Sequence, residues 1–326
     1  MKEHNRRDFM KFAGMTLGLG TLYAVAPGLH SSAMGRAFSE RSRDANGESV
    51  EPFTFLQLSD SHVGFSGPPD PLGTAAFERA VEVVNGMARR PDLVLFTGDL
   101  THDSEDKDQH AARMQRFKEI AGRMKVDKTF YVPGEHDAGM DGGLLFREHF
   151  GETHYSFDHK GVHFIALDNV SKPKPQVGTA QLEWLKKDLA RFPKTAPIVV
   201  FTHRPLFDLR PDWEWFTSDG DDVMNVLSPY EHVTVLYGHI HRDDEHTEGH
   251  VKHYAARSLI FAFPDPEKVN GVKKPIAFDK DHPFQNLGIR AVNAGAGELA
   301  INDIELTLRE YSGVNGIQQL SKAVSL

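Results

Sequence analysis

Six short apolar runs alternate with longer amphipathic stretches along the chain, and this alternation restricts the fold more than any other feature. The runs cover residues 53–58, 93–97, 129–132, 162–167, 198–202 and 233–237. They are rich in β-branched and aromatic side chains and are bounded by polar turns, as expected of buried strands. Helical patterns lie between several of them, at residues 74–89, 104–124 and 179–191. The sequence therefore predicts an α/β fold in which helices pack on a mixed sheet.

Side chains that can bind metal ions follow five of the six runs. These side chains are Asp60, His62, Asp99, Glu135, His136, His203, His239 and His241. In open α/β sheets, the loops at the carboxyl ends of the strands converge on one crevice, so we expect these side chains to meet there. A single histidine after a strand is commonly an ordinary turn or surface residue. We interpret five of the 18 histidines in that way: His110, His149, His159, His246 and His250.

The composition limits the chemistry of such a cluster. The chain contains no cysteine, which excludes disulfides, thiol nucleophiles and thiolate ligands. Carboxylate and imidazole ligands suit Mn, Fe, Zn or Co. More ligands are present than one tetrahedral zinc ion needs, and one carboxylate can bridge two ions. A pair of ions roughly 3.5–4 Å apart binds phosphoryl oxygens and generates hydroxide at neutral pH. The residue set therefore favours phosphoryl chemistry at a dinuclear metal site.

Taken in order, the blocks that carry these residues resemble the signature of the calcineurin-like metallophosphoesterases. The blocks are Asp60-x-His62, Gly98-Asp99, Gly134-Glu135-His136-Asp137, His203 after a strand, and Gly238-His239-x-His241. The spacing of the blocks, and the segments 155–158, 164–168 and 181–185, are most similar to the class III cyclic-nucleotide phosphodiesterases. The resemblance covers residues 52–245. It implies a four-layer α/β/β/α sandwich of mixed sheets, and hydrolysis of small-molecule phosphate esters, diesters above all, by a metal-bound hydroxide.

The resemblance also implies a role for each residue of the site. Asp99 would bridge two metal ions, with Fe, Mn and Zn as the candidates. The ligands would be Asp60, His62, Asp99 and His241 for one ion, and Asp99, Glu135, His203 and His239 for the other. His136 would stabilise the transition state or protonate the leaving oxygen, and Asp137 would orient His136.

Glu135 departs from the family pattern, which has an asparagine at this position. With Glu135 as a ligand, two divalent ions and one hydroxide, the centre is neutral instead of singly positive. Such a site should hold its cations more tightly and attract an anionic phosphate less. Three outcomes remain open: a glutamate ligand with activity kept, a hydrolase with altered substrate or weaker activity, or a non-hydrolytic metal- or partner-binding protein. Replacing Glu135 with asparagine is expected to loosen metal binding and raise activity.

Residues 1–33 resemble a twin-arginine export signal. Arg6, Arg7, Phe9 and Lys11 precede a weakly apolar segment, residues 12–26, which is shorter than the roughly 20 residues of a membrane span. We therefore expect a signal peptide at 1–33, a linker at 34–51, export by the twin-arginine machinery and a periplasmic or secreted protein without a stable membrane anchor. The net charge of −9 argues against a nucleic-acid binding surface.

Residues 52–326 are predicted to form one metallophosphoesterase domain. Its C-terminal part contains strand-like segments at 251–255, 258–263, 288–292 and 300–308. We expect these segments to extend or cover the second sheet. Residues 273–275 and 279–284 are predicted to belong to a long loop over the site.

Overall fold

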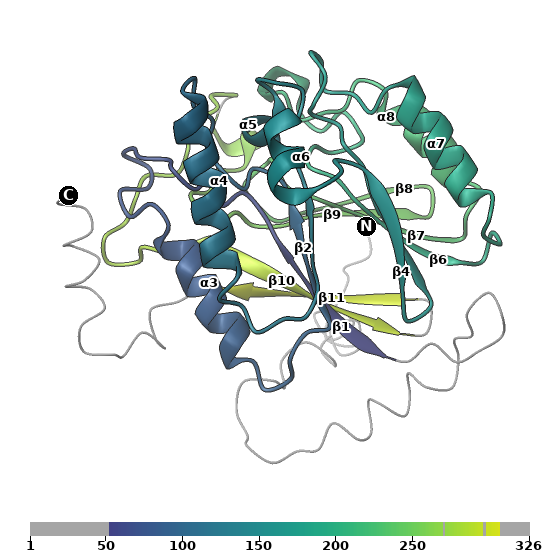
Figure 1. Ribbon diagram of the computed structural model, residues 1–326, viewed down its shortest axis with the longest axis horizontal. Coiled ribbons are helices and arrows are strands. Elements are labelled where there is room, and N and C mark those ends of the chain that lie inside the picture. The colour runs from purple at the N-terminus through teal and green to yellow at the C-terminus, as the bar shows by residue number, and fades with distance from the viewer. Residues whose placement is uncertain (1–51, 270, 296–297, 307–326) are drawn as a thin grey trace, which may run out of the picture. The chain divides into compact units, whose positions relative to one another are not determined.

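The computed structural model describes residues 52–269, 271–295 and 298–306. The predicted signal peptide and linker lie outside this part of the chain. Two β-sheets form the centre (Figure 1). Helices α3 (Ala75–Gly86) and α4 (Lys107–Ala121) lie on one side, and α7 (Thr179–Leu189) and α8 (Gly220–Leu227) lie on the other. The predicted α/β architecture with mixed sheets is therefore confirmed.

The first sheet has the strand order β11-β10-β1-β2-β3. Its strands are β1 (Phe53–Leu58), β2 (Leu93–Thr97), β3 (Thr129–Val132), β10 (Gly288–Gly295) and β11 (Glu298–Glu305). Strands β1, β2 and β3 are parallel, whereas β10 runs antiparallel to both β1 and β11. The first three strands have the bounds that the apolar runs predict.

The second sheet has the order β4-β5-β6-β7-β9-β8. Its strands are β4 (Tyr155–His159), β5 (Val162–Ala166), β6 (Pro197–Phe201), β7 (His232–Tyr237), β8 (Asp244–Glu248) and β9 (Val251–Ala255). The four inner strands are parallel, and the antiparallel strands β4 and β8 form the two edges. Their carboxyl ends therefore point in one direction, as a shared site requires.

The helices are shorter than their sequence patterns predict. They are α3 (Ala75–Gly86), α4 (Lys107–Ala121), α5 (Glu135–Ala138), α6 (Leu144–Phe150), α7 (Thr179–Leu189), α8 (Gly220–Leu227) and two 3₁₀ turns, η1 (Pro211–Trp213) and η2 (Pro266–Lys268). Helix α4 begins late because the Asp106 carboxylate accepts hydrogen bonds from the amides of Asp108 and Gln109 and so caps its first turn. No helix in the described residues is long and apolar enough to cross a membrane.

Alternation along the strands assigns apolar side chains to three of the four buried apolar clusters in the described residues. Leu56 of β1 faces the α3–α4 layer with Phe77, whereas its neighbour Phe55 faces the second sheet. The rings of Phe55 and Phe164 meet edge to face across the two sheets, with centroids 5.4 Å apart. On the outer face of the second sheet, Val200 packs with the α7 and α8 side chains. Successive side chains of a strand point to opposite faces, which is why one strand supplies two cores.

Of the C-terminal segments that the sequence predicts to extend or cover the second sheet, only the first extends it. Strand β9 does join that sheet, but β10 and β11 add to the first sheet beside β1. Without β10, the hydrogen-bonding groups along one side of β1 would be an open sheet edge, and pairing removes that edge. Residues 258–263 form no strand. Their backbone instead crosses the ends of other strands, where the Leu259 amide donates to the Ser59 carbonyl over 3.1 Å.

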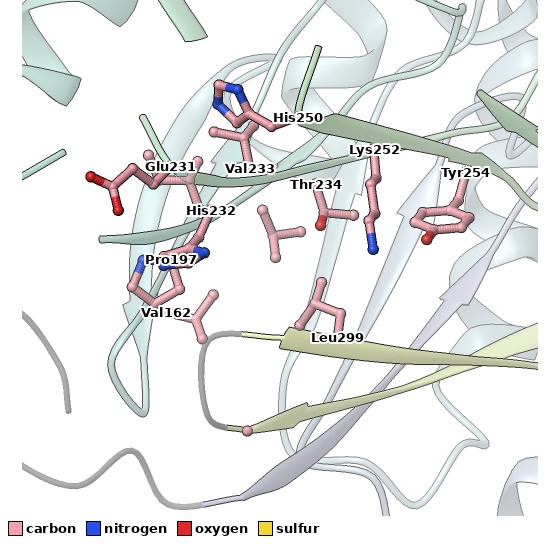
Figure 2. A pocket seen from close by; sticks show the side chains of 13 residues that line it. Val162, Pro197, Glu231, His232, Val233, Thr234, His250, Lys252, Tyr254 and Leu299 are labelled. Carbon is pink, nitrogen blue, oxygen red and sulfur yellow. The ribbon is translucent and has the colours of Figure 1, made fainter. Parts of the chain in front are cut away.

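A pocket opens at the amino ends of the parallel strands, opposite to the predicted site. Val162, Pro197 and His232 line it (Figure 2) and are the first residues of β5, β6 and β7. Leu299 of β11 closes the other side. None of the predicted metal ligands is among its lining residues. The predicted ligands lie instead beyond the carboxyl ends of the strands.

Candidate metal centre and active site

The structure brings all seven predicted metal ligands together beyond the carboxyl ends of the strands. Asp60 and His62 follow β1, Asp99 follows β2, and Glu135 begins α5 after β3. His203 follows β6, and His239 and His241 follow β7. Six of the seven are at most 6% exposed, and the Glu135 side chain is 25% exposed. Most of the cluster is therefore shielded from water, which strengthens its electrostatic interactions.

The ligands form two groups of four that share Asp99. The first group is Asp60, His62, Asp99 and His241, and the second is Asp99, Glu135, His203 and His239. Each residue offers one ligand atom, and within a group all of these atoms lie within 4.8 Å of one another. The same Asp99 Oδ2 lies 3.3 Å from His62 Nε2 and 3.4 Å from His203 Nε2. One carboxylate oxygen therefore faces both groups. The grouping is the one that the family resemblance implies.

The backbone at this cluster adopts a conformation that most residues avoid. Positive φ angles occur at Asp60 (54°), His62 (38°), Asp99 (48°), His239 (66°) and His241 (52°). Left-handed backbone at non-glycine residues costs energy and is concentrated at functional sites. Here it turns the chain sharply after β1, β2 and β7, so that the side chains point into the cluster.

Two of the motif glycines are required because there is no room for a side chain beside the ligands. A Cβ atom at Gly134 would lie 2.0 Å from Asp99 Oδ1. A Cβ atom at Gly238 would lie 2.0 Å from Ser59 Oγ and 2.6 Å from Asp60 Oδ2. The glycines let neighbouring backbone segments approach the carboxylates closely. In particular, the His239 amide donates to both carboxylate oxygens of Asp60 over 3.1 Å.

Three of the histidines are held by backbone carbonyl groups through the ring nitrogen that faces away from the cluster. His203 Nδ1 lies 2.7 Å from the Thr97 carbonyl, and His241 Nδ1 lies 2.9 Å from the Phe261 carbonyl. His239 is turned the other way, with Nε2 3.1 Å from the Glu214 carbonyl. A ring N–H donated to a carbonyl leaves the other nitrogen as a free acceptor, which is how proteins orient metal-binding histidines.

The inner atoms of the second group suit a bound cation. Glu135 Oε2 and His203 Nε2 are buried and have no hydrogen-bond partner among the described residues, although they lie 2.9 Å apart. Burial alone would raise the pKa of Glu135, but the charges of His239, His203 and Arg204 outweigh burial and hold that pKa well below its usual value. Burial would likewise lower the pKa of His203, but Asp99 and Glu135 raise it well above its usual value. These buried carboxylates therefore stabilise positive charge, and the oxygen and imidazole donors fit divalent ions.

His136 lies at the rim of the first group, with its side chain 31% exposed. Its backbone amide donates to Asp99 Oδ1 over 3.0 Å, and its ring stacks on His102 with centroids 4.6 Å apart. Burial would lower the pKa of His136, but the Asp99 charge and the contact with Asp103 raise it to about 9. The imidazole is therefore protonated near neutral pH and can donate a proton or stabilise negative charge.

The carboxylate that orients His136 is Asp103, not Asp137. His136 Nδ1 contacts Asp103 Oδ1, whereas the buried Asp137 accepts hydrogen bonds from the amides of Leu100, Thr101 and Gly134 over 2.8–2.9 Å. Consecutive residues of a helix point about 100° apart, so α5 turns Asp137 away from the imidazole. Asp137 instead ties the loop after β2 to the start of α5. The orienting role predicted for Asp137 is therefore wrong.

Sequence reasoning missed other residues around the centre. His102 faces the first group, with its Nδ1 3.4 Å from His62 Nδ1, and Arg204 directly follows His203. The sequence offered one signal for each: Arg204 directly follows the predicted ligand His203, and His102 lies three positions after Asp99. His110, interpreted as a surface group, is only 6% exposed, and its Nε2 lies 3.2 Å from Thr101 Oγ1.

The predicted loop near residue 273 does reach the site. Lys273 Nζ donates to the Trp213 carbonyl over 2.8 Å, next to the Glu214 carbonyl that holds His239. Burial lowers the pKa of Lys273, and the charges of Glu135 and Glu214 oppose that shift. A lysine charge therefore acts on the second ligand group from this loop.

Two stacked sheets that carry two groups of oxygen and imidazole ligands at the strand ends define a metal-dependent phosphoric ester hydrolase. The chain belongs to the calcineurin-like phosphoesterase family, whose model matches residues 53–243, more than half of its length.

Curated relatives agree with this assignment, and a solved structure shares the fold. The chain is 28% identical, over 57% of its length and 71% of the relative, to a probable glycerophosphodiester phosphodiesterase of Arcobacter nitrofigilis. It is 27% identical, over 58% and 69% of the two chains, to a 3′,5′-cyclic adenosine monophosphate phosphodiesterase of Haemophilus influenzae. The purple acid phosphatase of yellow lupin seeds shares the fold with a TM-score of 0.56 and 13% identity, over 81% of this chain and 53% of that one.

Proposed function

We propose that the protein is a dinuclear metal-dependent phosphodiesterase that acts on small phosphate diesters. The observation that carries the proposal is the position of Asp99 Oδ2, which lies 3.3 Å and 3.4 Å from histidine nitrogens of the two ligand groups. Relatives whose names specify glycerophosphodiesters and cyclic adenosine monophosphate support a diester substrate. Fe, Mn and Zn are the candidate metals, since all ligands are carboxylates or imidazoles.

Each part of the site has a task in this proposal. The two ligand groups would hold one ion each, and the ions would supply Lewis acidity toward the phosphoryl oxygens and a water activated at neutral pH. His136 faces the first group from the rim and would donate a proton to the leaving oxygen. Asp103 holds its Nδ1, which leaves Nε2 as the nitrogen that meets substrate. No protein nucleophile is needed.

We also propose that the twin-arginine machinery exports the chain, so that the protein acts in the periplasm or is secreted. The motif at Arg6 and Arg7 supports this proposal. The twin-arginine route carries folded proteins, and a buried centre loaded with metal before export suits that route.

Hydrolysis of bis(4-nitrophenyl) phosphate by the full chain, dialysed against Mn²⁺ or Zn²⁺, tests the proposed activity. We expect turnover that falls at least 100-fold in Asp99→Ala and in His136→Ala, because one removes the shared ligand and the other the proton donor. His232→Ala is the matched control, since this exposed histidine lies at the amino end of β7. Protein that binds two ions but hydrolyses neither mono- nor diesters would refute the proposed activity.

A further inference from the structure

Arg204 reaches the second ligand group through Glu135, the residue that departs from the family pattern. Its Nη2 lies 3.2 Å from Glu135 Oε1, and its Nη1 donates to the Glu214 carbonyl over 2.7 Å. The Arg204 side chain is 9% exposed. The same Oε1 lies 2.9 Å from His239 Nδ1, so the guanidinium and a candidate metal ligand meet at one carboxylate oxygen.

The backbone of Arg204 is fixed in place by a buried polar network. Asn169 Nδ2 donates to the Arg204 carbonyl over 2.9 Å and to Thr217 Oγ1 over 2.8 Å. Asn169 Oδ1 accepts from the Arg204 amide over 3.3 Å. Glu135 is fixed as well, because it begins α5 and its carbonyl accepts from the Gly139 amide over 2.9 Å. The contact between Arg204 and Glu135 is therefore part of the fold. It is not a contact that two mobile surface side chains make by chance.

The charges of this pair change the electrostatics of the metal centre. An arginine is protonated at every accessible pH, and a buried charge is costly without a partner. Glu135 adds one negative charge relative to the asparagine of the family pattern, and Arg204 adds one positive charge beside it. With the guanidinium counted and Lys273 left out of the sum, two divalent ions, one hydroxide and the three carboxylate ligands carry a net charge of +1 instead of zero. Arg204 would therefore counteract the weaker attraction for an anionic phosphate that is expected from Glu135 alone.

We propose that Arg204 is a positioning residue that offsets the charge of Glu135, so that the second metal group binds its ion and attracts a phosphate ester as an asparagine-containing site would. This inference rests on the proposed function, because it concerns the same centre. It predicts that the two residues are coupled: each single substitution disturbs the centre, and the double substitution restores it.

The single substitutions should shift metal affinity in opposite directions. Arg204→Met leaves an uncompensated carboxylate, so the second Mn²⁺ ion should bind about tenfold more tightly and the KM for an anionic diester should rise. Glu135→Asn leaves an unpaired buried guanidinium beside the ion, so that ion should bind at least tenfold more weakly. The double variant, Glu135→Asn with Arg204→Met, should return to within about threefold of the starting protein, because the charges again balance.

Equilibrium dialysis of the full-length variants against buffered free Mn²⁺, with metal content measured by mass spectrometry, tests the coupling. The KM and kcat for bis(4-nitrophenyl) phosphate give the second measurement. Arg204→Lys keeps the charge and should keep the affinity for the second ion. Arg210→Met removes a nearby arginine that pairs with Asp212 and should change neither quantity.

The results separate this inference from the proposed function. Starting protein that binds fewer than two ions, or has no turnover, would contradict the proposed function. A different result would overturn only the inference. In that result the starting protein binds two ions and turns over, Arg204→Met and Glu135→Asn both weaken binding of the second ion, and the two losses of affinity add up in the double variant. If Arg204→Met does not fold, Arg204→Lys decides: a loss of affinity in spite of the retained charge would also overturn it.

Discussion

Gly134 is the position where one methyl group should disable the centre. A Cβ atom there would lie 2.0 Å from Asp99 Oδ1 and 2.2 Å from the Asp99 backbone nitrogen. Cβ atoms in proteins essentially never approach other heavy atoms within 3.0 Å. In Gly134→Ala, Asp99 and the start of α5 must therefore separate by about 1 Å. Because Asp99 faces both ligand groups, the shift displaces both.

The expected loss follows from that displacement. Misplacing a reacting group by about 1 Å costs on the order of 100-fold in rate, so kcat/KM for a diester should fall at least that far. Overpacking of this kind destabilises a fold by about 1–3 kcal/mol, so the variant should still fold at room temperature. Binding of the second Mn²⁺ ion should weaken as well, because the distance between the Glu135 and Asp99 carboxylates changes and the two can no longer bind the same ion equally well.

Steady-state hydrolysis of bis(4-nitrophenyl) phosphate, metal content after dialysis and urea unfolding measure these effects. Gly86→Ala is the matched control, since a Cβ atom at this last residue of α3 meets nothing within 4 Å. Its activity should be unchanged and its stability within about 1 kcal/mol of the starting protein. A Gly134→Ala protein with unchanged kcat/KM and two bound ions would refute the steric argument.

Three other predictions test separate parts of the molecule. Asp103→Asn should lower kcat about 10- to 100-fold with metal content unchanged, because His136 loses the partner that orients and charges it; an unchanged kcat would show that catalysis does not depend on the contact between Asp103 and His136. Burial lowers the pKa of His253 from 6.5 to about 4, so the folded protein binds this proton more weakly than the unfolded chain, and about 3 kcal/mol of stability present above pH 6.5 is lost as the pH falls through 4. His253→Leu should remove that part of the acid destabilisation in urea unfolding at pH 7 and pH 4.5; equal losses with and without His253 would contradict it. Replacing Arg6 and Arg7 with lysine should leave the protein in the cytoplasm by cell fractionation, and unaffected export would exclude the twin-arginine route.

Some features of the site could be predicted because they depend on local pattern. Short apolar runs bounded by turns predict the bounds of β1, β2 and β3, and the parallel arrangement of these strands brings the residues that follow them to one edge of the sheet. The residue type at each strand end then limits the chemistry to metals that prefer oxygen and imidazole ligands. For this reason the sequence alone places Asp60, Asp99 and Glu135 together.

Other features depend on contacts between distant segments, which only the tertiary structure decided. The choice between Asp103 and Asp137 as the partner of His136 rests on where α5 directs each side chain, and β10 pairs with β1 although 239 positions separate Thr54 from Asn293. Arg204 lies one residue after a recognised ligand, yet its effect on Glu135 depends on the separate chain segments that place the two side chains 3.2 Å apart. The charge of a metal centre is a sum over everything packed around it, and packing between remote segments leaves no local pattern in a sequence.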